Sequence, residues 1–121
     1  MNKRGFTLIE VLIAVILLAI GFLAIGALHV TSTRGGLFSS NLMQASYVAQ
    51  DRLEFLKNLP FTDAQIQVGS STKDSRPISG VVFNWSDQIT TAGGDARKIT
   101  VTVTWNDGVD HNVSFSTIRS Q

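Results

Sequence analysis

The chain has 121 residues, ten basic and nine acidic side chains, and no cysteine. This length is enough for one folded domain with an attached segment, but not for two independent hydrophobic cores. The near-zero net charge of +1 does not favour a nucleic-acid-binding surface, and the lack of cysteine excludes disulfides and thiolate chemistry in these residues.

The first predicted element is an apolar segment over residues 6–30, preceded by Lys3, Arg4 and Gly5. A bilayer core of about 30 Å is crossed by about 20 helical residues, so this segment is long enough to span a membrane. The basic residues before it predict a cytoplasmic N-terminus. A cleaved secretory signal peptide fits poorly, because the apolar run is too long and no A-x-A-like site ends it.

One carboxylate, Glu10, interrupts this apolar segment. An acidic side chain near the centre of a membrane-spanning helix costs about 2.5–3.5 kcal/mol, so it usually has a function or a partner. Two interpretations follow. The segment is an ordinary membrane anchor with Glu10 near the lipid headgroups, or Glu10 is a functional carboxylate.

The helical pattern continues after Val30 and predicts one long helix over 6–58. Apolar residues at steps of three and four form one face that would pack on a small domain: Leu42, Ala45, Ala49, Leu53 and Leu56. The pair Gly35-Gly36 is a predicted weak point, and Pro60 predicts the end of the helix near Leu59. At about 1.5 Å per residue, such a helix would be about 80 Å long.

The remaining residues, 59–121, predict a small antiparallel sheet. We expect a loop over 61–76 with one short strand near 66–68, and then strands over 81–85, 99–105 and 113–118. Turns are predicted at 91–95 and at Asn106-Asp107-Gly108. The sheet would have one apolar face, and the helix could cover it. The predicted fold class is therefore α+β.

The run Lys3-Arg4-Gly5-Phe6-Thr7-Leu8-Ile9-Glu10 resembles the class III signal of type IV pilins and pseudopilins. The resemblance implies that a prepilin peptidase cuts after Gly5 and that Phe6 becomes an N-methylated N-terminus. Lys3 and Arg4 would be the leader charges. Glu10 would be the assembly carboxylate, paired with the amino terminus of a neighbouring subunit.

The same resemblance implies three parts: a leader over 1–5, a long helix over 6–58 with its transmembrane segment at about 6–30, and an antiparallel β head over 59–121. Removal of Lys3 and Arg4 would change the net charge from +1 to −1. The implied partners are other pilins, the peptidase and N-methyltransferase, and inner-membrane lipid; no nucleic acid is expected. The head would be periplasmic before the subunit enters a surface fibre.

Two later segments resemble a minor pilin of the pilus-modification, V-type class: Ala49–Lys57 and the hairpin over 101–119. Many major pilins carry a C-terminal disulfide, which this chain cannot form. Three functions remain open. The first is a structural minor pilin of a type IV pilus, serving adhesion, motility or DNA uptake. The others are a minor pseudopilin of a type II secretion system and, less favoured, a membrane-anchored periplasmic enzyme.

No other pattern predicts catalysis, a cofactor or a metal. His29 and His111 are isolated in the sequence, and no G-x-S-x-G nucleophile motif occurs. Asp107 and Asp110 flank Gly108, but they lack the ligand spacing of a calcium loop, so we interpret this segment as a solvated turn. We therefore expect a structural protein and not an enzyme.

Overall fold

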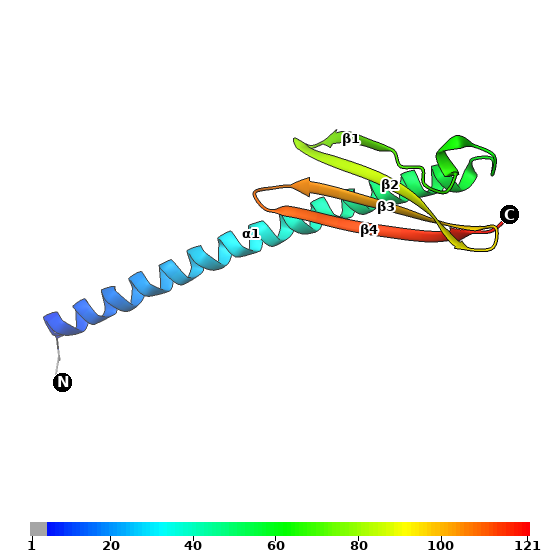
Figure 1. Ribbon diagram of the computed structural model, residues 1–121. Helices are drawn as coiled ribbons and strands as arrows, with labels where there is room; N and C mark the ends of the chain where they lie inside the picture. Colours follow the sequence, from blue (N-terminus) through cyan, green and yellow to red (C-terminus); the bar gives the residue numbers. More distant parts are fainter. Residues whose placement is uncertain (1–4) are drawn as a thin grey trace. The chain divides into compact units, whose positions relative to one another are not determined.

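The computed structural model describes residues 5–121 as an α+β fold of one long helix and a four-stranded sheet (Figure 1). The elements in chain order are α1 (Leu8–Asn58), the 3-10 helix η1 (Ala64–Ile66), β1 (Lys73–Ile78), β2 (Val81–Gly93), β3 (Ala96–Asn106) and β4 (Asp110–Arg119). Lys3 and Arg4 lie outside the described residues. The chain forms two compact units, Met1–Leu37 and Phe38–Gln121. We call them the N-terminal unit and the head.

The N-terminal unit is helical from Leu8 onward, and its apolar side chains are exposed. Phe22 and Leu23 are 65% and 76% exposed, for example. The predicted weak point at Gly35-Gly36 does not interrupt the helix, because both residues have helical backbone hydrogen bonding. Near the end of this unit, the Thr33 hydroxyl donates to the backbone oxygen of His29 at 2.9 Å.

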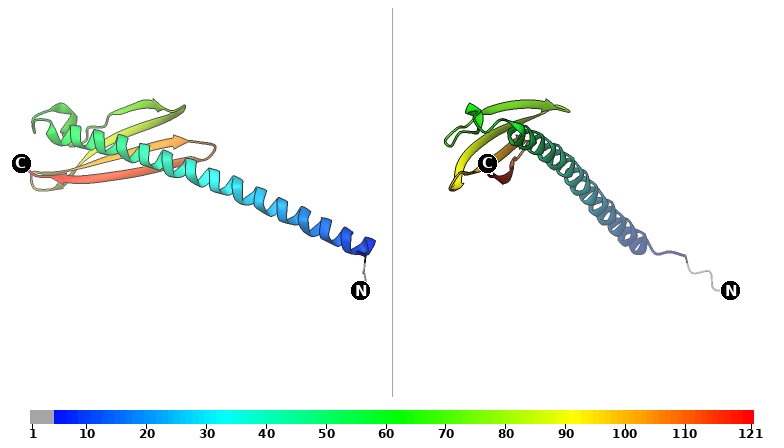
Figure 2. Two further views of the ribbon diagram at one scale, coloured as in Figure 1. Left: turned by 180° about the vertical axis from the view of Figure 1, so that it is seen from behind. Right: turned by 90° about the vertical axis from the view of Figure 1, so that its right-hand side faces the viewer.

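The head is a meander in which each strand pairs antiparallel with the next, in the order β1-β2-β3-β4. The part of α1 that belongs to the head lies along one face of this sheet (Figure 2). Strand β3 alternates strictly from Ile99 onward: Ile99, Val101, Val103 and Trp105 are buried against the helix, while the threonines between them face outward. This alternation is the period-2 pattern of a sheet with one covered face.

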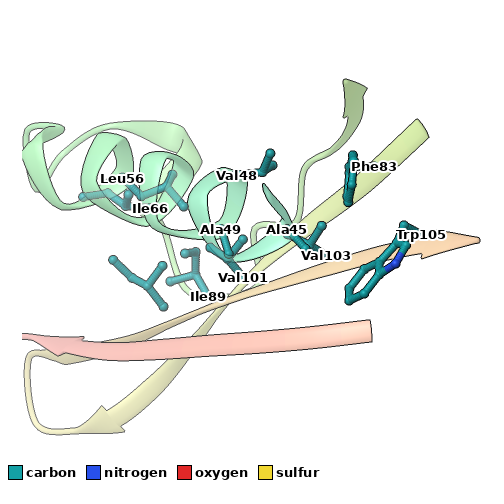
Figure 3. Close-up of a cluster of buried hydrophobic side chains, with 11 residues drawn as sticks. Ala45, Val48, Ala49, Leu56, Ile66, Phe83, Ile89, Val101, Val103 and Trp105 are labelled. Atoms are coloured by element: carbon teal, nitrogen blue, oxygen red, sulfur yellow. The ribbon is translucent and has the colours of Figure 1, made fainter. Parts of the chain in front are cut away.

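The core of the head confirms the predicted helical face (Figure 3). Ala45, Ala49 and Leu56 are buried, and Leu42 and Leu53 pack against them half-buried. The small alanine side chains allow the helix backbone to approach the sheet closely. Phe83 from β2 and Ile66 from η1 complete the cluster, so the segment that links the helix to the sheet is also part of the core.

The connection after α1 is held by two arginines that lie opposite each other on β3 and β4. Arg97 donates from Nη1 to the backbone oxygens of Phe61 and Ile66, at 2.7 and 2.9 Å. Arg119 donates to the oxygen of Leu59 at 2.7 Å. Both guanidinium groups also stack on the Phe61 ring. The helix ends at Asn58, because Pro60 cannot continue it.

Three local predictions differ from the structure. The short strand predicted near 66–68 is wrong: residues 64–66 form η1, which is capped by the Asp63 carboxylate accepting from the Gln65 N–H at 2.8 Å. The predicted loop over 61–76 contains the start of β1, whose residues are all polar or proline up to Ile78. Strand β2 continues to Gly93 and bulges after Thr91, so the turn is shorter than predicted. Strand β1 was not predicted because a polar edge strand has no alternation of apolar and polar residues. It is recognised as a strand only through its antiparallel pairing with β2.

Candidate functional site

The N-terminal unit carries the site residues that the sequence predicts, and its first helical turn is capped locally. The backbone N–H of Glu10 donates to the Thr7 hydroxyl oxygen at 3.3 Å and to the Thr7 carbonyl at 3.1 Å. Thr-x-x-Glu is the sequence pattern of a capping box, and a carboxylate in the first turn interacts favourably with the helix dipole. Glu10 therefore has a local structural role that the sequence analysis did not consider.

Phe6 and Glu10 line one side of a shallow groove on the helix surface. The groove has a volume of about 470 Å³, and its lining is completed by Val11, Ala14, Val15 and Leu18. Phe6 is 82% exposed, and Glu10 is exposed as well. No cation of residues 5–121 forms an ion pair with Glu10. A single carboxylate thus lies in an apolar groove next to the residue expected to become the mature N-terminus.

Between Val11 and Leu28 the surface of the N-terminal unit is apolar. Helix α1 contains an 18-residue window with a mean hydropathy of 3.0, and none of that window is buried in the structure. Such a surface is stable in lipid or against other apolar helices, and an uncovered patch of this size is rare in soluble proteins. The apolar helix is thus suited to anchor the chain in a membrane.

The structure places the other predicted processing residue in an open position. Gly5 lies before α1, and no neighbouring atom lies within 4 Å of the position a Cβ would occupy there. Nothing in the fold therefore requires glycine at this position, so a requirement for it would come from an enzyme that recognises the segment. Lys3 and Arg4, the predicted leader charges, lie outside the described residues.

The head contains a buried ion pair that the sequence analysis missed. Arg52 of α1 pairs with Asp87 of β2, with Nη2 and Oδ2 2.7 Å apart. The other carboxylate oxygen accepts from the Thr72 N–H at 2.6 Å, and the guanidinium lies 4.5 Å from the Trp85 ring centroid. Asp87 lies on the inward face of β2, because it alternates with Phe83 and Trp85 along the strand. A carboxylate at such an inward position needs a charged partner, so this alternation could have predicted the ion pair.

A second polar cluster joins α1 to the hairpin between β3 and β4. The Asn41 side chain donates to the Asp107 carboxylate at 2.9 Å, and His111 Nε2 lies 3.0 Å from its other oxygen. The hydrogen bond from Asn41, followed by the charge of His111, holds the pKa of Asp107 below its ordinary value of 3.8. The turn predicted as merely solvated is thus a contact between helix and sheet.

The metal-ligand residue types of the described chain are dispersed. Within residues 5–121, no group of three or more His, Asp or Glu side chains is placed to hold a metal ion. The His111 ring contacts Trp105 and Phe38 in addition to Asp107, with ring centroids 5.2 and 4.9 Å away. Its position is explained by packing in the described part of the chain.

Comparison with protein families identifies the N-terminal segment. A family model described as the prokaryotic N-terminal methylation motif matches residues 1–26. No curated protein and no solved structure matches the chain. The motif implies processing by a prepilin peptidase and assembly with other pilins. The motif is followed by a long N-terminal helix and a small antiparallel sheet, and this combination is consistent with a type IV pilin-like protein.

Proposed function

We propose that the protein is a structural minor pilin that joins, or primes the assembly of, a type IV pilus. The observation that carries this proposal is the N-terminal methylation motif on an apolar helix whose surface is uncovered. The rest of the chain, Phe38–Gln121, forms a head with its own hydrophobic core. The resemblance of Ala49–Lys57 and of the hairpin over 101–119 to V-type minor pilins supports the subclass. The head is periplasmic before assembly and faces outward in the fibre.

Processing at the Gly5–Phe6 bond is the first step of the proposed function. The peptidase removes residues 1–5, and the new α-amine of Phe6 is methylated. Mass analysis of the N-terminus of membrane-extracted protein tests this step. We expect a methylated Phe6 terminus, and a Gly5→Leu variant that stays uncut. An intact Met1 terminus in cells with active peptidase, or cleavage near Val30, would contradict the proposal.

Glu10 then acts as the assembly carboxylate. Its charge is costly in lipid, and its apolar groove offers no cation from residues 5–121. A neighbouring subunit supplies the missing charge through its N-terminal amine. Removing one partner of a buried ion pair typically costs about 3–5 kcal/mol. Since 1.4 kcal/mol corresponds to about tenfold, loss of Glu10 lowers incorporation by about a hundredfold or more.

Two substitutions separate this role from helix capping. Glu10→Ala removes both the charge and a side chain of the type found in capping boxes, whereas Glu10→Gln removes the charge and keeps such a side chain. If the charge is required, both variants are processed and stay in the membrane but are depleted from sheared fibres. Incorporation of Glu10→Gln at the wild-type level would assign Glu10 to the helix cap instead.

A minor pseudopilin of a type II secretion system is the second candidate, because the same N-terminal motif serves both kinds of fibre. The two candidates differ in the major subunit with which the protein co-assembles. Mass spectrometry of the fibre or membrane complexes that contain the protein distinguishes them, as do the neighbouring genes. Copurification with secretion-system subunits alone would replace the pilus assignment.

A further inference from the structure

One segment of α1 is much poorer in helix-forming residues than the helix on either side of it. Seven of the ten residues 31–40 are glycine, serine or threonine, compared with two in 21–30 and one in 41–50. Glycine has a much lower helix propensity than alanine, and serine and threonine also rank below alanine, leucine and lysine. The segment is nevertheless helical throughout. Intrinsic propensity therefore contributes little to the helix at this place.

The segment also lacks the tertiary contacts that stabilise the next part of the helix. All residues from 31 to 40 are exposed, and the first buried residue of α1 is Asn41. Within the described chain, no ion pair and no side-chain hydrogen bond joins residues 31–37 to the sheet. Ring contact with the head begins at Phe38, whose centroid lies 4.9 Å from that of His111. Helical hydrogen bonding is therefore the main support of residues 31–37.

Two threonine hydroxyls at the start of the segment bond back to the preceding turn of the helix. Thr31 Oγ1 donates to the backbone oxygen of Ala27 at 3.0 Å, and Thr33 Oγ1 donates to that of His29 at 2.9 Å. Hydroxyl bonds of this kind slightly destabilise a helix and often bend it. They add to the low helix propensity of the segment.

The two glycines of the segment, Gly35 and Gly36, are not required by packing. Beyond the local helix backbone, no atom lies within 4 Å of the position a Cβ would occupy at either residue. Alanine would fit at both positions, and each replacement would favour the helix by about fourfold to fivefold. The glycine pair thus lowers the stability of the helix by about twentyfold without a steric reason in the described chain.

We propose that residues 31–37 form a flexible joint, centred on Gly35-Gly36, which lets the head change direction while the apolar helix stays in lipid. A segment held by few contacts opens locally while better packed neighbours stay intact. On one side of the joint, lipid holds the apolar residues between Val11 and Leu28. On the other side, the head has its own core. The joint requires the anchored helix, but it does not depend on the kind of fibre.

A different explanation of the glycine pair is close packing against another chain. Small residues allow two helices to approach each other closely in a membrane or a helical assembly. In that case α1 is rigid in the isolated protein, and substitution of the glycines changes assembly alone. The two explanations therefore differ in the motion of the protein before it meets a partner.

Nitrogen-15 relaxation of the full-length protein in detergent micelles tests the proposal, because it gives a rotational correlation time for each backbone amide. With a rigid α1, the head and residues 11–28 tumble together with the micelle. With a flexible joint, the head turns partly by itself. We expect the amides of β3 to have a shorter correlation time than those of residues 11–28. Equal correlation times would overturn the joint and favour close packing.

The decisive variant is Gly35→Ala/Gly36→Ala, and the matched control is Gly21→Ala/Gly26→Ala. Both variants replace two glycines of the same helix at which a Cβ meets no neighbouring atom. We expect the first variant to raise the correlation time of the head to that of residues 11–28, and the control to leave the difference unchanged. The proposal is overturned if the first variant leaves the difference unchanged or if the control removes it.

Hydrogen exchange of the same samples gives a second measurement. In the wild-type protein, the amides of residues 35–40 should be less protected than those of residues 45–49, which pack against the sheet. Gly35→Ala/Gly36→Ala should raise the protection factors of residues 35–40 by about twentyfold. Equal protection of both segments in the wild-type protein would overturn the joint. Neither measurement involves a fibre, so a failed joint leaves the pilus assignment intact, and absence of the protein from fibres leaves the joint intact.

Discussion

The N-terminal unit and the head share one helix, yet they are stabilised in opposite ways. In the N-terminal unit the apolar side chains are exposed, and the backbone hydrogen bonds are satisfied within the helix. In the head the apolar side chains are buried between helix and sheet. The comparison shows that the first unit requires an external environment, lipid or other helices, whereas the head supplies its own.

The head also depends on long-range polar contacts that have no counterpart in residues 5–37 of the N-terminal unit. The Arg52–Asp87 pair and the Asn41–Asp107 hydrogen bond each join α1 to the sheet at a different place along the helix. They fix the register between helix and sheet, which apolar contacts alone leave loosely defined. Substitutions should therefore have large effects in the head and small effects on folding in the N-terminal unit.

The largest effect is expected from the position at which the chain is cut. A fragment of residues 38–121 keeps the helical face that covers the sheet, so we expect it to be soluble and to unfold cooperatively. A fragment of residues 60–121 exposes the inward faces of Val101, Val103 and Trp105, and should aggregate. Size-exclusion chromatography and thermal unfolding measure both. A soluble, cooperative 60–121 fragment would show that the helix is not part of the core.

The next largest effect is expected at the buried ion pair. Arg52→Ala leaves the Asp87 carboxylate, whose side chain is 0% exposed, without its charged partner. Breaking such a pair from one side typically lowers the free energy of unfolding by about 3–5 kcal/mol. The matched control is Arg76→Ala, which removes an exposed contact to Asp51 at 3.7 Å and should change the free energy of unfolding by about 0.5 kcal/mol or less. Denaturant unfolding measures both variants. Equal losses of unfolding free energy would show that the buried pair contributes no more than the exposed one.

The same leucine-to-alanine substitution sharpens the comparison between the two units. Leu56 is 0% exposed in the head, whereas Leu23 is 76% exposed in the N-terminal unit. Leu56→Ala should lower the free energy of unfolding of the head by about 2–5 kcal/mol, through lost burial and the cavity left behind. Leu23→Ala should leave the unfolding midpoint of the full-length protein in detergent unchanged. A similar loss from both would mean that the N-terminal unit contributes to the stability of the head.

The smallest effect is a pH dependence. The pKa of Asp107 is held below 3.8 in the folded head by the Asn41 hydrogen bond and then by the His111 charge. A depressed carboxyl pKa stabilises the fold above the unfolded pKa, and this stabilisation is lost as the pH falls through the lower folded value. Asp107→Asn and Asn41→Ala should both weaken the fall in unfolding midpoint below pH 3.8. An unchanged slope in both variants would exclude Asp107 as a contributor.

The sequence by itself determined the elements whose signal lies within one segment. The apolar run after Gly5 and the helical face from Leu42 to Leu56 defined the long helix, because a period of three and four residues needs no knowledge of the partner surface. The alternation around Val101 and Val103 defined β3 in the same way. The N-terminal methylation motif could also be recognised from the sequence, and the family-model match over residues 1–26 confirms it.

Only the tertiary structure decided the features that depend on pairing between distant segments. Strand β1 is polar and carries Pro77, so it is defined by its ladder with β2 and not by its own pattern. Arg52 is not part of the apolar face from Leu42 to Leu56, and only the folded structure brings it next to Asp87 on the inward face of β2. That β1 and β4 are the two edge strands of the sheet is known only from the strand order. Local periodicity is set by neighbours in the chain, whereas charge pairing and edge exposure are set by neighbours in space.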